Sequence, residues 1–195
     1  MHLNDFDKNG KIEHIISVFE DDKAYLIATK REVTSQMPYL LKKYLKYHDF
    51  KEQTVEDIFT TEQLASSLKL EVFETESMIF MNEKGHFLPK KLPFHAQLSP
   101  TYSILTIDVD EDGYQNIIMG GNQFRAKPKV GIYAGSYGTI IRSLGDNSLE
   151  VLGSDESGFF VEGEIRDIKI VTVNGEELIL VARNNDKLKV FKKVE

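Results

Sequence analysis

From Leu70 to Val194 the apolar residues of this chain occur in short runs separated by glycine, asparagine and acidic residues. Runs of this length suit strands, and the residues between them are those that favour turns. A sequence of this kind has no continuous helical face to bury. The pattern therefore predicts an antiparallel all-β body over this part of the chain.

Two further strands are expected before Thr29, over residues 15–19 and 24–28, with a polar turn between them. Between about Lys30 and Lys69 the apolar spacing becomes helical, and Thr54 and Thr60 resemble helix N-caps. Pro38 suits the first turn of a helix. We therefore predict a helical insertion of two or three helices at 31–70, within the first repeat, accessory to the β body and packed on one side of it. Its expected buried residues are Leu40, Leu41, Tyr44, Leu45, Ile58, Phe59, Leu64 and Leu68.

The β body contains an internal repeat. The segment from Asp5 to Glu13 aligns with the segment from Asp108 to Asn116, with acids or amides at positions 1, 3, 5 and 9 and glycine at position 6. A third copy around Val173–Glu176 has lost its acids, which predicts a structural turn. Without the helical insertion the copies recur about every 60 residues, somewhat more than the period of about 40–50 of propeller blades.

These repeats predict a mainly β fold, a partial β-propeller with about three four-stranded antiparallel blades and a helical insertion. The expected organisation is a single propeller-like domain, or a propeller fragment, over residues 1–195. Closed propellers use about 4–8 blades. We therefore expect either part of a longer parent chain or a homo-oligomer that covers the exposed strand edges.

The second copy has the ligand spacing of a calcium loop. Three carboxylates at alternate positions can converge on a hard cation, because glycine at position 6 lets the chain turn back. This assigns Asp108, Asp110, Asp112, the backbone carbonyl of Tyr114, and Asn116 as ligands. Position 12 is Met119 within a strand, so the loop is not an EF-hand. The alternative is an acidic turn, with aspartate present for its turn propensity alone.

The first copy offers Asp5, Asp7, Asn9, the carbonyl of Lys11, and Glu13. It lacks the third aspartate and contains Lys8, so calcium and a plain turn both remain open for it. Other candidates are weaker: the five histidines have no zinc spacing, and Ser136 in the glycine-rich segment 131–138 has no obvious histidine or acidic partner. No catalytic site is therefore predicted, and the chain is not expected to be an enzyme.

Composition excludes several classes of protein. There are 31 acidic against 24 basic residues and a net charge of −7, which argues against nucleic-acid binding. No apolar run is long enough to span a membrane, and residues 1–5 have neither the basic flank nor the apolar stretch of a signal peptide, so none is expected in this chain. The chain contains no cysteine, so it has neither disulfides nor thiolate metal sites.

The chain resembles the C-terminal part of the FG-GAP/VCBS-repeat proteins, in the group related to cartilage acidic protein and common in Bacteroidetes. The segment from Asp108 through Asn122 is similar to that family's D-F-D-G-D-G-x-x-D loop and the strand that follows it. The departures are Val109, Glu111 and Asn116 here, and Lys8, Asn9 and Glu13 in the first copy. The resemblance implies an extracytoplasmic, surface-associated propeller with integrin-like repeats, supported by calcium and without a known catalytic centre.

Two functions follow from these expectations. The first is a non-catalytic, calcium-supported module that binds a protein or glycan at the cell surface, with Ca²⁺ weakly bound in a structural role. The alternative is an accessory segment of a larger exported enzyme whose chemistry lies elsewhere.

Overall fold

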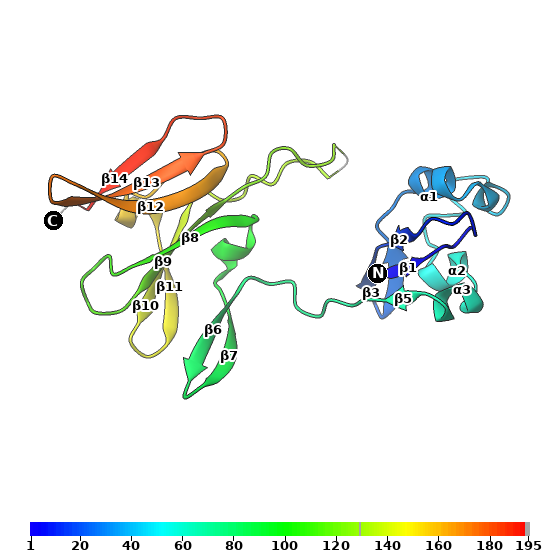
Figure 1. The fold of residues 1–195 in the computed structure, drawn as a ribbon, viewed down its shortest axis with the longest axis horizontal. Coiled ribbons are helices and arrows are strands. Elements are labelled where there is room, and N and C mark those ends of the chain that lie inside the picture. The colour runs from blue at the N-terminus through cyan, green and yellow to red at the C-terminus, as the bar shows by residue number, and fades with distance from the viewer. Residues whose placement is uncertain (129, 194–195) are drawn as a thin grey trace. The chain divides into compact units, whose positions relative to one another are not determined.

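The computed structural model describes residues 1–128 and 130–193, which belong to two compact units (Figure 1). The N-terminal unit is Met1–Glu74 and the C-terminal unit is Thr75–Glu195. All described sheets are antiparallel and none of them closes, so the mainly β prediction is confirmed. The single propeller-like domain stays a prediction, because two compact units can be separate domains or parts of one larger fold.

The N-terminal unit contains two small sheets and a set of short helices. One sheet has the strand order β2-β1-β5, and β3 and β4 form a separate hairpin. The turn of this hairpin is Asp21-Asp22, both with positive φ, as two-residue hairpin turns require. The elements are β1 (His2–Asn4), β2 (Glu13–Ile15), β3 (Ser17–Glu20), β4 (Lys23–Leu26), α1 (Lys30–Gln36), η1 (Pro38–Leu41), α2 (Val55–Ile58), α3 (Thr61–Ala65) and β5 (Leu68–Lys69).

Threonine caps fix where the three α-helices of this unit begin. Thr29, Thr54 and Thr60 each form a capping box with the residue three positions later. The pairing of Asp57 with the backbone N–H and hydroxyl of Thr54 lowers the pKa of the Asp57 carboxyl. The two helix starts expected from the sequence at Thr54 and Thr60 are therefore confirmed.

The apolar spacing after Pro38 does not produce an α-helix. Only a 3₁₀ turn forms, over Pro38–Leu41, and the chain then continues through turns to Gln53. Because the segment folds back on itself, Tyr44 meets Phe50 edge to face at a centroid distance of 5.3 Å. Of the residues expected to be buried, Leu40, Tyr44, Ile58 and Phe59 are buried and Leu64 is half-buried, whereas Leu41, Leu45 and Leu68 are exposed.

The prediction that the insertion is accessory is wrong. Of the buried core residues of the N-terminal unit, three come from before residue 30, namely Phe6, Ile15 and Ala24, and the partly buried Leu26 and Ala28 pack against this core. The other buried members of the core are Val33, Met37, Leu40, Tyr44, Phe50, Val55, Ile58 and Phe59. Four short strands expose too little apolar surface to form a core alone, so the inserted residues complete it.

The C-terminal unit is built from three antiparallel sheets. Strands β8 to β11 form a four-stranded meander, β12 to β14 form a three-stranded meander, and β6 and β7 form a hairpin. The elements are β6 (Met78–Glu83), β7 (His86–Lys91), η2 (Phe94–Gln97), β8 (Thr101–Ile107), β9 (Asn116–Gly121), β10 (Thr139–Leu144), β11 (Ser148–Leu152), α4 (Ser154–Ser157), β12 (Ile165–Val173), β13 (Glu176–Arg183) and β14 (Lys189–Lys192).

Both faces of the four-stranded sheet are covered. On one face, Ile118 and Ile140 pack against Ile165, Ile168 and Val181 of the three-stranded sheet. On the other face, β9 and β10 pack against η2 and the β6–β7 hairpin through a cluster of Met119, Ile141, Leu92 and Ala96. Strands buried on both faces have continuous apolar sequences, as β9 and β10 do.

The turns of the hairpins match the sequence. Asn174 and Gly175 both have positive φ between β12 and β13, so the third repeat copy forms the structural turn that was predicted for it. Lys84 and Gly85, in the turn between β6 and β7, also both have positive φ.

A buried carboxylate joins three segments of the C-terminal unit. Glu164 is 5% exposed and accepts hydrogen bonds from Phe124 N at 2.8 Å, Arg166 Nη2 at 2.7 Å and Asn184 Nδ2 at 2.7 Å. These partners lower the pKa of the Glu164 carboxyl, with the Phe124 N–H as the largest cause. Since the folded state holds the proton less tightly than the unfolded chain, the stabilisation is complete above the ordinary pKa and is lost as the pH falls through the lowered one.

Glu164→Gln is therefore expected to weaken the acid dependence of stability. At neutral pH the variant should be less stable than the wild type, because the amide cannot accept from all three donors. Below the ordinary glutamate pKa the difference between the two proteins should shrink. Urea unfolding at a series of pH values measures this, with the exposed strand residue Glu177 changed to Gln as the control. A pH profile of Glu164→Gln parallel to the wild type would contradict the assignment.

Candidate metal centres

The two acidic repeat copies form loops at equivalent places in their units. The first acidic loop, residues 5–13, connects β1 to β2, and the second acidic loop, residues 108–116, connects β8 to β9. Each therefore lies between two paired antiparallel strands, which fix both of its ends.

The two loops have the same local geometry. The residue at position 4 has a left-handed backbone conformation in both loops, with φ 59° at Lys8 and 58° at Glu111. The glycine at position 6 also has a positive φ in both. In both loops a carboxylate oxygen at position 1 accepts from the position 6 N–H, Asp5 from Gly10 and Asp108 from Gly113. In both, the side chain at position 5 accepts from the position 7 N–H. The repeat inferred from the sequence thus corresponds to a repeated backbone conformation.

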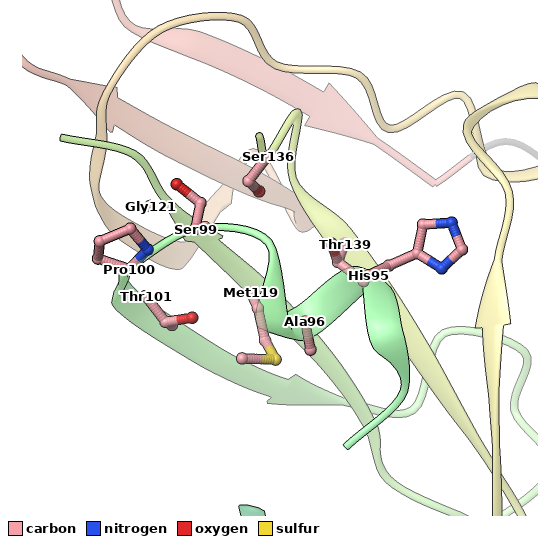
Figure 2. Close-up of a pocket in the computed structure, with 10 residues that line it drawn as sticks. His95, Ala96, Ser99, Pro100, Thr101, Met119, Gly121, Ser136 and Thr139 are labelled. Atoms are coloured by element: carbon pink, nitrogen blue, oxygen red, sulfur yellow. The ribbon is translucent and has the colours of Figure 1, made fainter. Parts of the chain in front are cut away.

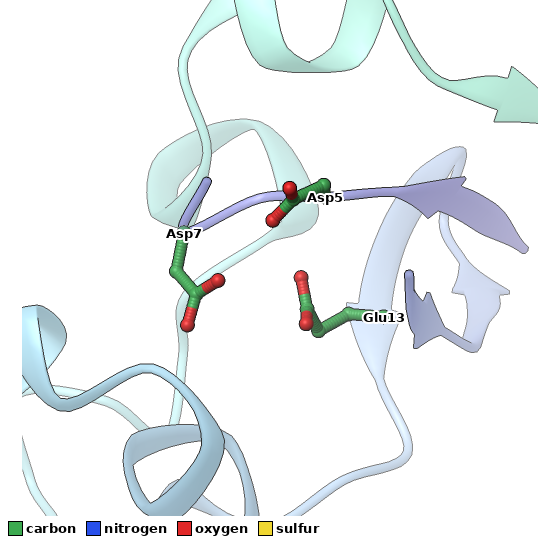
Figure 3. Close-up of side chains that lie close together, drawn as sticks. All are labelled: Asp5, Asp7 and Glu13. Atoms are coloured by element: carbon green, nitrogen blue, oxygen red, sulfur yellow. The ribbon is translucent and has the colours of Figure 1, made fainter. Parts of the chain in front are cut away.

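In the first acidic loop the three carboxylates gather on one side. Asp5, Asp7 and Glu13 each offer an oxygen, and these oxygens lie within 4.8 Å of one another. Figure 3 shows the three side chains pointing toward a common space. Glu13 is only 7% exposed, and one of its oxygens accepts from Phe6 N at 2.8 Å. This loop therefore has three acids in its cluster, with Glu13 in place of the missing aspartate.

In the second acidic loop the cluster is Asp108, Asp110 and Asp112, with oxygens again within 4.8 Å of one another. The Oδ1 atom of Asp108 is buried and has no hydrogen-bond partner among the residues that the structure describes. A buried carboxylate oxygen without a partner is costly. A cation held by these three carboxylates would satisfy it.

Asn116, at position 9 of the second loop, was expected to provide an oxygen ligand, and its side chain is oriented differently. Asn116 is buried, and its Oδ1 accepts from Ser143 N at 3.2 Å. Its Nδ2 donates to Asp110 Oδ1 at 3.0 Å. In this orientation Asn116 offers the cluster a donor and not an oxygen ligand. In the first loop, Asn9 likewise donates through Nδ2 to Asp7 Oδ2 at 2.8 Å.

Two cations, Arg142 and Lys193, lie beside the second loop, and no local sequence pattern pointed to either of them. Arg142 Nη1 is 3.9 Å from Asp110 Oδ2, while Nη2 of the same guanidinium bonds Glu150 at 2.7 Å and so raises the pKa of Arg142. Lys193 bonds Glu111 and lowers the pKa of that carboxyl. Arginine and lysine reach the loop from β10 and from beyond β14, so only tertiary structure brings them here.

The residues present fit a calcium ion at both loops. The first loop offers Asp5, Asp7 and Glu13, and the second offers Asp108, Asp110 and Asp112, all hard oxygen ligands of the kind that calcium prefers. The carbonyl groups of Lys11 and Tyr114 stand at position 7 of their loops. Bound calcium would supply positive charge that relieves the repulsion among the carboxylates.

Ser136 and His95 are not oriented toward each other as a nucleophile and its base would be (Figure 2). Ser136 and His95 both line a small cavity of about 10 Å³ between η2, β9 and the segment before β10. Figure 2 shows the imidazole of His95 pointing away from Ser136 and from the cavity. No histidine belongs to a metal-ligating cluster within the described residues.

Comparison of the chain with protein-family models, with curated proteins and with solved structures gives no match. Within residues 1–128 and 130–193, no helix is both long and apolar enough to cross a membrane. The class defined by fold and site is a mainly β protein with two acidic loops able to hold metal ions. Membership of the FG-GAP/VCBS-repeat family stays an expectation.

Proposed function

We propose that this chain is a non-catalytic binding module, a calcium-supported part of a β-propeller that acts outside the cytoplasm. The observation that carries the proposal is the matched geometry of the two acidic loops, each with three converging carboxylates between paired strands. The four-stranded meander β8–β11, with sheets on both of its faces, is the arrangement that a propeller blade requires.

The role assigned to calcium is structural. The metal-ligating groups lie in turns whose two ends are fixed by paired strands, so the role proposed for bound calcium is to hold the turn. Each cluster has only three carboxylates, and Arg142 already provides positive charge near the second. These features favour weak binding, on the order of the 10⁻⁴–10⁻³ M typical of extracellular modules.

Calcium is expected to raise the thermal unfolding midpoint of the chain. At that affinity, ~10 mM calcium stabilises the folded state by about 1.4–2.7 kcal/mol per site. Magnesium should have a smaller effect, because it needs a tighter octahedral shell than these loops offer. Thermal unfolding with calcium, with magnesium and with chelator measures the difference.

Two variants separate the sites. Asp7→Ala should remove the calcium response of the N-terminal unit, and Asp110→Ala that of the C-terminal unit, each leaving the other intact. Glu177→Gln, which removes an exposed carboxylate outside both loops, is the control and should respond as the wild type does. A midpoint that is indifferent to calcium, magnesium and chelator would reduce both loops to acidic turns.

A further inference from the structure

A groove of about 320 Å³ in the C-terminal unit has no lining residue in common with the acidic loops. It is formed by the segment before β10, the start of α4 and residues beside η2. Tyr137 and Phe160 form part of its wall, with ring centroids 4.8 Å apart and planes only 12° from parallel. Both residues remain exposed, by 49% and 43% respectively.

The backbone beneath Tyr137 is held in place by a buried side chain. Asn122, 2% exposed, donates from Nδ2 to Ser136 O at 2.6 Å and accepts at Oδ1 from Ser136 N at 3.0 Å. Tyr137 O accepts from Val161 N at 2.8 Å, which joins the segment to the neighbour of Phe160. The residue that carries the ring is therefore fixed on both sides.

Phe160 is fixed by its neighbours. Phe159 and Val161 are buried in the core between the two large sheets, whereas Phe160 between them is 43% exposed. Gly138 has φ 83°, and a Cβ there would come within 2.5 Å of the Phe159 ring. Glycine therefore lets the loop lie directly over Phe159, which brings Tyr137 over Phe160.

The exposed aromatic pair lies outside the buried clusters, and hydrogen bonds and buried neighbours anchor the backbone that carries its two rings. Fixed aromatic rings with a few polar groups beside them are the usual composition of a ligand site. Here the polar residues of the lining are Ser136, Thr139, Ser154, Asp155 and His95. The described lining contains neither lysine nor arginine.

The negative charge of this lining favours a neutral ligand over an anionic one. Phosphates, sulfates and uronates would meet the Asp155 carboxylate in a lining without lysine or arginine, and nucleic acid would also face a net charge of −7. The neighbouring Lys189 ammonium already donates to Phe160 O at 3.0 Å. A sugar ring presents an apolar C–H face that can lie on the electron-rich face of an aromatic ring. Its hydroxyls can donate to Asp155 and exchange hydrogen bonds with the serine and threonine hydroxyls.

We propose that this groove binds a neutral glycan, with a sugar ring stacked on the Tyr137–Phe160 pair and its hydroxyls bonded to Asp155. The proposal gives a ligand class to the binding function proposed above, on which it rests. Its site shares no residue with either acidic loop, so the two proposals can fail independently.

Affinity electrophoresis in gels that contain soluble xylan, galactomannan, mixed-linkage β-glucan or dextran tests the proposal. At least one of these neutral polysaccharides should retard the wild-type chain, and anionic polygalacturonate should not. Calorimetry with an oligosaccharide of the active polymer then gives affinities. Tyr137→Ala should weaken binding about tenfold or more, because a stacked ring contributes on this scale, whereas Tyr137→Phe should retain it.

Phe80→Ala is the matched control, because Phe80 is an exposed aromatic residue on the β6–β7 hairpin, outside the groove. It should bind as the wild type does, as should Asp110→Ala, which tests the calcium proposal separately. Circular dichroism confirms that each variant is folded. Retardation by none of the neutral polymers, stronger binding to polygalacturonate, an equal loss in Phe80→Ala, or Tyr137-dependent binding to a polypeptide matrix instead would each overturn the assignment.

Discussion

Replacing residues 31–65 by a short glycine–serine bridge is expected to unfold the N-terminal unit. Eight of its buried core side chains, from Val33 to Phe59, come from this segment. Burying eight apolar side chains contributes on the order of 12–24 kcal/mol, which is at least comparable with the net stability of a typical small domain, about 5–15 kcal/mol. Phe6, Ile15 and Ala24 would be left exposed to water.

The C-terminal unit should survive this deletion, since its two clusters contain no residue of the N-terminal unit. Amide hydrogen exchange resolved by residue distinguishes the outcomes: protection should vanish in β1 to β4 and persist in β8 to β13. Protected amides in β1 to β4 would mean that the strands fold without the insertion.

Single substitutions in the core of the N-terminal unit test the same packing without removing a whole segment. Met37→Ala removes a fully buried side chain and should cost about 2–5 kcal/mol. Leu45→Ala is the matched control, because Leu45 is 77% exposed although it shares the apolar spacing of its buried neighbours, and it should change stability by less than about 0.5 kcal/mol.

Asn122→Ala is expected to destabilise the C-terminal unit by about 4 kcal/mol, because several buried hydrogen bonds and a backbone preference are lost together. Besides its two bonds to Ser136, the amide donates to Gly163 O at 2.8 Å and accepts from Ser99 Oγ at 2.7 Å. The residue also has φ 85°, which asparagine tolerates better than alanine.

Urea unfolding of Asn122→Gly separates these two contributions. Glycine adopts the positive φ freely, so it should recover only about 1 kcal/mol of the loss and leave the unpaired hydrogen-bonding groups as the main cost. Both variants should also weaken any ligand binding in the groove beside Tyr137, because they lose the two hydrogen bonds between the Asn122 side chain and the Ser136 backbone. A loss below about 1 kcal/mol for alanine would show that water replaces the amide without penalty.

Local features were accessible from the sequence because their causes are local. Thr54 and Thr60 cap helices through bonds to residues three positions away, and Asn174-Gly175 turns a hairpin through its own backbone preferences. The acidic loops belong to the same group: the spacing of Asp5 and Asp7, and of Asp108 and Asp110, with glycine at position 6, is sufficient to draw carboxylates together. For the same reason the mainly β character was predictable.

Other features depended on residues far apart in the chain. The spacing of Leu40, Leu41 and Leu45 is equally consistent with a helix, and only the folding back of the chain decided that Leu40 is buried and Leu45 exposed. Arg142 reaches Asp110, and Asn122 holds Ser136, across strand pairings that no local pattern encodes. The sequence alone thus determined the strands, turns, caps and acidic loops, because these depend on neighbouring residues. Tertiary structure decided which apolar residues form the core and where the exposed aromatic pair lies, because both depend on packing between distant segments.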